Sequence, residues 1–586
     1  MNNISIIGIG LLESFFASWL LIRAGGLSTR SILGPLLFVI IAVFFITCMQ
    51  KITNSKRTSL IVCILSLIFT ILYLAADSST LVEGLNNRFF QLIILAACFA
   101  GLFFLFFHSL SLLFFYGEQY ILKSEEKAIK KLPLIGFFLC LLAWLPYFLY
   151  EYPGVMTPDS INQLEQVIGM VPYGNHHPWS HTMVLSLFYH IGRIFTDNVS
   201  IAISFFTVFQ MMFMAFCIAF LISTLQKFKI KNIFLFLVLA FYAFVPYHAV
   251  FAVTIWKDVM FSGAVLLFTV SLLRLLFLHD CLFSHKKTRI ITLALYILSG
   301  IMLSLFRTNG WYAFLISLPF LLFAFRHEWK LMFPIHLAIL VFALLIKGPV
   351  MTSFHVTQPD FVESICIPLQ QVARVICEDK ELTSAQWESV HKVIDTTYIK
   401  DLYSPGFADN MKELVRAGNP DYLTEHKAEY FKLWLSLGLR YPSVYLSAYI
   451  DQTKGYWYPD VPYAVAEIDG IIQNETGAVS HPLIGGPVIV KAKEIFLKLG
   501  DMMPLYGLLF SMGAMFWVLL CMIFLITAKK QYLKYILYIP GVAIIFTLFL
   551  ATPVSSEFRY AYSLAYALPL YLFIPFMSVD SSKSTK

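Results

Sequence analysis

Long apolar runs, separated by short polar connections, extend through most of the sequence. A helix that crosses a membrane needs about 20 mostly apolar residues, and fourteen runs reach or approach that length. The pattern therefore predicts an α-helical polytopic membrane protein with about 14 transmembrane helices. Their predicted bounds are 4–22, 31–50, 58–76, 89–115, 132–150, 199–225, 233–253, 259–279, 290–306, 311–325, 331–347, 504–527, 535–551 and 560–577.

Basic residues are distributed unevenly over the short connections between these runs. If the N-terminus is cytoplasmic, the inner connections carry twenty Lys and Arg, whereas the short outer connections carry seven. Lys and Arg in short loops are retained on the cytoplasmic side of a membrane. The sequence therefore predicts a multi-pass protein of the cell membrane with both termini cytoplasmic.

Two stretches depart from this simple alternation. Residues 181–196 are apolar, but a crossing there would invert the charge pattern, so we predict an amphipathic helix on the outer interface. Residues 348–502 hold 20 of the 35 acidic residues and 13 of the 42 basic ones. This segment has the length of an ordinary domain, and we predict an extracellular, mostly helical domain with helices near 364–377, 410–417 and 425–440.

The predicted spans and polar segments divide the chain into four parts. These are an N-terminal addition of four spans (1–115), a membrane core (116–347) whose first outer loop is 151–198, the extracellular domain (348–502), and C-terminal spans with a short cytoplasmic tail (503–586).

Composition agrees with membrane insertion and excludes several other classes. Hydrophobic residues make up 59% of the chain and charged residues 13%, against about 45–50% and 25% in soluble proteins. The net charge of +7 is too small to indicate nucleic-acid binding, and cytoplasmic anchoring explains most of it. The nine Cys show no CxxC motif and no Cys/His spacing typical of a metal site.

Polar residues gather where apolar segments end on the predicted outer side. Ionisable groups beside apolar segments usually face a cavity or one another. Because these groups come from distant parts of the chain and meet at one interface, they suggest a site for an anionic amphiphile. The candidates are Asp159, His176, His177, Trp179, Lys257, Asp258, Arg307, Asn309, Glu557, Arg559 and Tyr560, together with Trp457 in an aromatic loop of the outer domain.

Several candidates have a purely structural alternative. Asp159 or Thr157 can cap a short helix after Pro158, while Lys257 and Asp258 can pair with each other. The spacing HHxxxH from His176 is not a familiar metal-ligand pattern, so packing at the interface is favoured there. The rings around Trp457 either meet a sugar or anchor the chain at the membrane surface.

Six short motifs follow one another along the chain: PGxxTPDSxxQ (153–163), HHPW (176–179), WKDVxF (256–261), RxNG (307–310), PLQQxARV (368–375) and EFRY (557–560). Their order and sidedness resemble the GT-C superfamily of membrane glycosyltransferases, and more narrowly an uncharacterised bacterial group of GT-C-like proteins. The similarity spans roughly residues 132–577 and does not cover the first four spans. It implies a GT-C-like membrane core in which 132–150 is the family's first span.

The resemblance implies a glycosyltransferase that takes a sugar from a polyprenyl-phosphate donor at the outer face. The acceptor would be a glycan or lipid of the cell envelope, as in polysaccharide biosynthesis. Such transfer needs a carboxylate to accept the proton of the acceptor hydroxyl, and Asp159 suits this role. It also needs cations on the phosphate, which Arg559, Lys257 and Arg307 can supply. Tyr560 and Trp179 are candidates to line the sugar pocket.

The chain departs from the common family pattern at one point. Many members carry a pair of acidic residues in the first outer loop, whereas here Glu151 and Glu165 are near Asp159 but not adjacent to it. The sequence therefore assigns no metal ligands and no cofactor, and a divalent cation stays an open alternative. Membrane lipids are expected partners and nucleic acid is not.

Two other functions remain as alternatives. A transporter or flippase of lipid-linked glycans would place its ionisable residues near the middle of the membrane, on broken helices in repeated halves. The candidate residues here cluster at the ends of spans, and no internal repeat is evident, so the enzyme is favoured. A non-enzymatic scaffold would explain the outer domain but not the convergence of charges.

Overall fold

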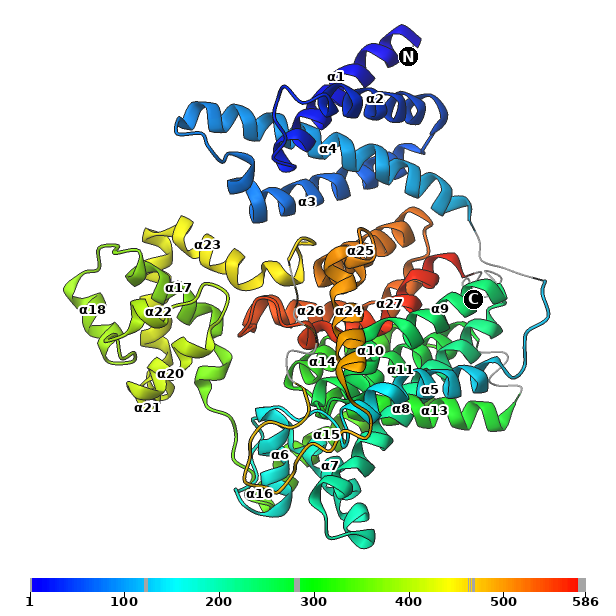
Figure 1. The fold of residues 1–586 in the computed structure, drawn as a ribbon, viewed down its shortest axis with the longest axis vertical. Coiled ribbons are helices and arrows are strands. Elements are labelled where there is room, and N and C mark those ends of the chain that lie inside the picture. The colour runs from blue at the N-terminus through cyan, green and yellow to red at the C-terminus, as the bar shows by residue number, and fades with distance from the viewer. Residues whose placement is uncertain are drawn as a thin grey trace. The chain divides into compact units, whose positions relative to one another are not determined.

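The computed structural model describes residues 3–120, 125–278, 285–461, 463, 465 and 469–577. Within these ranges the backbone is helical, with isolated β-bridges in place of sheets (Figure 1). The C-terminal tail after 577, which we predict to be cytoplasmic, lies outside the described residues. By their internal contacts, the residues form two compact units.

The first unit holds residues 1–121 with 517–535 and 574–576. Between two of its helices, Glu13 Oε2 lies 2.7 Å from His108 Nε2. The ring of Trp517 stacks on Phe69 with centroids 4.2 Å apart, so a late segment of the chain completes this bundle. Its first four helices are α1 (Asn3–Ala24), α2 (Leu33–Lys51), α3 (Lys56–Leu81) and α4 (Arg88–Gln119).

Nine helices of the described residues are long and apolar enough to cross a membrane, which confirms a helical membrane protein. Besides α1 to α4 they are α5 (Leu132–Tyr150), α8 (Val199–Lys227), α11 (Lys257–Phe277), α13 (Lys286–Leu305), and the stretch Trp329–Ser353 that comprises α15 (Trp329–Leu345), a π-helical turn and α16 (Met351–Ser353).

The other five predicted spans contain helices that are bent or short. α9 (Asn232–Phe244) and α10 (Pro246–Val253) form one pair bent by 54°. The proline at the start of α10 explains the break, because it cannot donate to the preceding turn. The remaining ones are shorter than the about 20 residues typical of a crossing: α14 (Thr308–Ala324), α25 (Met512–Ala528), α26 (Ile539–Ala551) and α27 (Tyr562–Phe573).

Helix α11 forms the centre of the second unit. Nearly all of its residues are buried, and it packs against α8, α13 and α27. This central position fixes the first turn of α11, which carries Lys257 and Asp258, relative to several other parts of the chain.

Two short helices follow α5. They are α6 (Pro158–Ile168) and α7 (Trp179–Phe195), which pack against each other. α7 lies along α8, where Phe188 stacks on Phe209 at 3.8 Å, and it leaves Ile194 and Phe195 exposed. The stretch predicted as an amphipathic helix therefore is a helix with one packed and one exposed apolar face.

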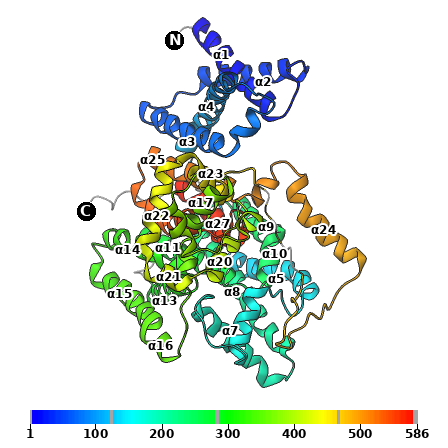
Figure 2. The same cartoon turned by 90° about the vertical axis from the view of Figure 1, so that its left-hand side faces the viewer.

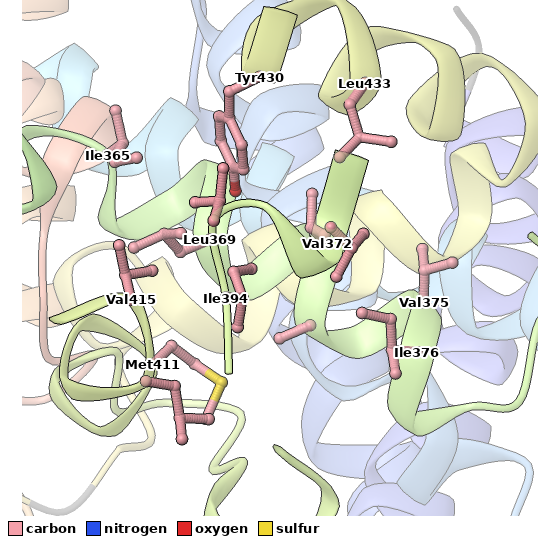
Figure 3. Packing of buried hydrophobic residues seen from close by; sticks show 14 of the residues in the cluster. Ile365, Leu369, Val372, Val375, Ile376, Ile394, Met411, Val415, Tyr430 and Leu433 are labelled. Atoms are coloured by element: carbon pink, nitrogen blue, oxygen red, sulfur yellow. The ribbon is translucent and has the colours of Figure 1, made fainter. Parts of the chain in front are cut away.

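The polar segment contains a helical domain with its own core, here called the α17–α23 domain. Its predicted helices are confirmed as α17, α20 and α22, and buried aliphatic side chains such as Leu369, Val372 and Leu433 pack between them (Figure 3). The helices are α17 (Cys366–Cys377), α18 (Ser384–His391), α19 (Ile399–Leu402), α20 (Asp409–Ala417), α21 (Pro420–Glu425), α22 (Lys427–Arg440) and α23 (Pro442–Thr453).

The rest of the polar segment does not belong to that core. Residues 469–486 run back along the loop that follows α5, and α24 (Pro487–Met502) then follows as a separate helix. The domain with its own core is thus shorter than the predicted 348–502, since its buried residues run from Val362 to Tyr445.

Candidate functional site

The loop between α5 and α6 is held in place by extended backbone pairing. Val155 N–H donates to Val253 O at 3.0 Å, and Ile255 N–H donates to Val155 O at 2.9 Å. Thr207 Oγ1 donates to Pro153 O at 2.7 Å. A side chain at Gly154 would meet Thr207 and Val253, so only glycine allows this approach. The pairing brings the start of α6 beside the start of α11.

Local capping fixes the start of α6. Thr157 is the N-cap, Pro158 occupies the first helical position, and Asp159 lies in the first turn, an order that favours helix initiation. The Trp256 indole donates to Thr157 Oγ1 at 2.7 Å, and Ser160 Oγ donates to Ile255 O at 2.5 Å. The structural alternative for this motif is thus confirmed with Thr157 as the cap, which leaves the Asp159 carboxylate available for other contacts.

One oxygen of Asp159 is shared by two cations. Lys257 Nζ and Arg559 Nη1 each lie 3.0 Å from Asp159 Oδ2. His177 Nδ1 lies 3.8 Å from the same oxygen and 3.1 Å from Lys257 Nζ. Four residues that the sequence predicts as site residues therefore meet at a single point, although 400 positions separate Asp159 from Arg559.

A second ion pair adjoins the first. Arg307 Nη1 lies 2.5 Å from Asp258 Oδ1, and the Asp258 side chain is 1% exposed. Arg307 also donates to Tyr560 O at 3.2 Å. The Tyr560 ring lies 5.1 Å from the Arg307 guanidinium and 5.3 Å from that of Arg559, so it links the two pairs. We call Asp159, His177, Lys257, Asp258, Arg307 and Arg559 the charge cluster.

Three helices begin at the charge cluster. Asp159 lies in the first turn of α6, Lys257 and Asp258 in the first turn of α11, and Arg307 is the N-cap of α14. Helix N-termini carry partial positive charge and unpaired N–H groups, which favour anions. The environment is therefore suited to negative charge beyond what the carboxylates already provide.

Electrostatics keeps Asp159 ionised and His177 neutral. Burial by itself would raise the pKa of the Asp159 carboxyl, but Lys257 and Arg559 outweigh it, and the pKa is well below its usual range. Burial, together with Lys257, lowers the pKa of His177 to about 3. Asp159 raises the pKa of Arg559 further, against the effect of burial. At neutral pH the cluster thus contains charged pairs and one neutral imidazole.

The segment that carries Arg559 is supported by contacts that the sequence analysis did not predict. Gln452 Nε2 donates to Thr552 O at 2.9 Å and to Pro553 O at 2.7 Å. Tyr456 OH donates to Val554 O at 2.8 Å. A side chain at Gly455 would collide with the backbone of Ser555. These contacts join the end of α23 to the turn before Arg559. No sequence motif predicts them.

Several predicted residues lie beside the cluster or away from it. Glu557 is 3.6 Å from Arg559 Nε. His176 is exposed and contacts the ring of His177, and Asn309 follows Arg307 with both amide atoms buried and without a hydrogen bond among the described residues.

The two tryptophans predicted as site residues pack elsewhere in the protein. Trp179 is buried with Met351 and Val356 in a separate apolar cluster. Trp457 is buried and donates to Thr453 Oγ1 at 3.0 Å. Among the described residues, no hydrogen bond or ring contact joins either tryptophan to Asp159.

The residues present do not fit a divalent cation. Within the described ranges, no group of three or more His, Cys, Asp or Glu side chains is arranged to hold a metal ion. Asp159 and Asp258 are each paired with Lys or Arg, and these cations would repel a metal ion.

Comparisons with known proteins add a family. No curated protein and no solved structure matches the chain. Residues 170–586 match DUF6020, a family of unknown function. The matched range includes Lys257, Arg307 and Arg559 and begins after Asp159. Because it covers well over half of the chain, the protein belongs to the DUF6020 family.

Proposed function

We propose that the protein is a membrane glycosyltransferase with a GT-C-like core, which transfers a sugar from a polyprenyl-phosphate donor to a cell-envelope glycan or lipid. One observation carries the proposal: a single oxygen of Asp159 is shared by Lys257 and Arg559 beside the first turns of three helices. This arrangement provides a carboxylate and a binding place for an anion within one cluster.

The donor phosphate would bind where the cations converge. Lys257, Arg307 and Arg559 all belong to the charge cluster, and the guanidinium groups suit phosphate oxygens because they donate two parallel hydrogen bonds. The N-termini of α11 and α14 add further positive potential. The negative charge that grows on the leaving phosphate would be stabilised by the same groups.

Binding of the phosphate would also activate the base. While Lys257 and Arg559 hold Asp159, its low pKa makes it a weak proton acceptor. A phosphate that takes these cations as partners raises the pKa of the carboxyl. Asp159 then accepts the proton of the acceptor hydroxyl. At the same time, the oxygen of that hydroxyl bonds to the anomeric carbon of the donor sugar. The bond from that carbon to the phosphate oxygen breaks, and polyprenyl phosphate leaves with the electron pair.

The most direct experiment measures transfer by the purified protein with a panel of polyprenyl-phosphate sugars. The expected result is release of polyprenyl phosphate together with a glycosylated acceptor, and its loss in Asp159→Asn. Absence of transfer with every donor, by a protein that is folded in lipid, would overturn the proposal.

The proposal includes a topology with fourteen crossings, both termini cytoplasmic and the α17–α23 domain outside. In intact cells, a membrane-impermeant thiol reagent should label Asp401→Cys in that domain. It should not label Lys530→Cys, which lies in a predicted inner connection. The parent protein gives the background from native cysteines, and labelling in the reverse sense would reverse the orientation.

One observation favours a flippase of lipid-linked glycans as a second candidate. The α9–α10 pair is bent by 54°, and broken helices are common at the binding sites of transporters. The two functions differ in what happens to the donor. A flippase moves the intact molecule across the bilayer, whereas the proposed enzyme breaks the bond between sugar and phosphate.

A further inference from the structure

Helix α24 presents three different faces along its 16 residues. Val488, Ile495 and Met502, which are spaced seven apart, are 81%, 53% and 74% exposed. Because seven residues are close to two helical turns, these side chains form one apolar stripe. The charged residues of the next face are also exposed; they are Lys491, Glu494, Lys498 and Asp501.

The third face of α24 packs on the protein. Phe510 lies against Gly500, where a side chain would collide with its ring. Lys493, on the same face, pairs with Glu151 and with Asp469. Figure 2 shows α24 at the edge of its unit, near α5 and α10. The apolar stripe is therefore left without a covering element among the described residues.

The chemistry of α24 suits the headgroup layer of a bilayer. At 1.5 Å per residue the helix is about 24 Å long, shorter than a hydrocarbon core of about 30 Å, and five charged residues make it too polar to cross. Lys491 and Lys498 border the stripe, where long basic side chains can reach lipid phosphates. Exposed apolar residues continue through Met503 and Leu505 toward the apolar helix α25.

The contacts of Lys493 connect this helix to the loop that carries Asp159. Its partner Glu151 is the C-cap of α5 and begins that loop. Glu151 Oε2 accepts from Gly470 N–H at 2.7 Å, and Gly470 O accepts from Met156 N–H at 2.9 Å. A continuous set of polar contacts thus runs from α24 to the loop just before α6.

From these observations we infer that α24 lies in the lipid headgroup layer and, through Lys493, holds the loop that carries Asp159 at a fixed depth. The inference rests on membrane insertion and on α24 itself, not on glycosyl transfer. It therefore stands or falls separately from the proposed function.

The position of α24 can be tested with spin labels in the full-length protein, reconstituted in vesicles of phosphatidylcholine and phosphatidylglycerol. A label at Ile495→Cys should collide more with oxygen, which concentrates in lipid, than with a water-soluble nickel chelate. A label at the neighbouring Glu494→Cys should show the reverse. Equal access of nickel to both sites would overturn the inference, as would dipolar broadening between labels at position 495, which would indicate a second copy on the stripe.

The connection to the loop needs a separate measurement. Lys493→Met keeps the length of the side chain but removes its charge, whereas Lys498→Met is a matched control on the exposed face. Amide hydrogen exchange at Val155 and Met156 should become at least about tenfold faster in Lys493→Met only. Unchanged exchange in that variant, or an equal increase in both, would overturn the proposed coupling.

Discussion

The charge cluster and the surface of the α17–α23 domain both contain groups of ion pairs, but they are built differently. On the domain surface, Arg416 contacts Asp360, Glu363 and Glu413, and Arg440 contacts Glu381. These partners come from nearby parts of one small domain, and the exposed fractions of their side chains range from 21% for Glu363 to 88% for Glu381. In the charge cluster, the side chains come from four distant segments, and their exposed fractions range only from 1% for Asp258 to 27% for Asp159.

This difference has an energetic meaning. Exposed ion pairs contribute little to stability, because water screens the charges and each side chain loses freedom. Buried ion pairs are costly to assemble, and breaking one leaves an uncompensated charge. Charges that a fold retains in such a place favour a functional role, so the two regions should respond very differently to the same kind of substitution.

The largest contrast is expected at Asp159. Because Thr157 caps α6, Asp159→Asn keeps the helix start and removes only the charge. Turnover should fall by about a hundredfold or more, while donor binding persists because Lys257 and Arg559 lose a competing partner. Turnover and donor affinity of the purified variant test this. Glu165→Gln, in the same helix, is the control, and normal turnover of Asp159→Asn would refute the role as a base.

A smaller effect is expected at Arg559. Arg559→Ala removes a charged hydrogen-bond donor worth about 1.5–3 kcal/mol, so donor affinity should fall at least about tenfold. Arg559→Lys should lose part of the donor affinity, because a point charge replaces a bidentate hydrogen-bond donor. Titration of the donor measures both, with Arg440→Lys on the domain surface as control. Unchanged affinity in both Arg559 variants would make Arg559 a structural residue only.

Acid should weaken the cluster through His177. The folded protein keeps this imidazole neutral down to a pKa of about 3, whereas the unfolded chain takes up a proton below about pH 6.5. Between these values the unfolded state binds more protons, so stability falls as pH falls, by about 1.4 kcal/mol per pH unit. Melting temperatures at several pH values should show a shallower dependence for His177→Gln, and no such change for the exposed His176→Gln.

The smallest effect is expected on the domain surface. Arg440→Ala breaks an exposed pair with Glu381 at 3.2 Å, and the free energy of unfolding should change by about 1 kcal/mol or less. High salt should make even this change in the free energy of unfolding smaller, because it screens exposed charges. A loss as large as that caused by substitutions in the charge cluster would remove the distinction between the two regions.

Much of the secondary structure follows from the sequence because its causes are local. Apolar runs of membrane length, the cap at Thr157 and the break before Pro246 all act over a few residues. The helices near 364–377, 410–417 and 425–440 are confirmed for the same reason. Chemistry at the ends of spans also identified every residue of the charge cluster as a candidate, since ionisable side chains beside apolar segments need partners.

The pairing of those residues was decided by the tertiary structure. Lys257 and Asp258 are neighbours in the chain, but successive side chains on a helix do not face each other. Lys257 therefore meets Asp159, and Asp258 meets Arg307. Likewise, Gly455 allows the loop that carries Trp457 to approach Ser555 closely, and Trp457 is buried. Such contacts depend on how segments hundreds of residues apart pack together, and no local pattern in the sequence encodes that packing.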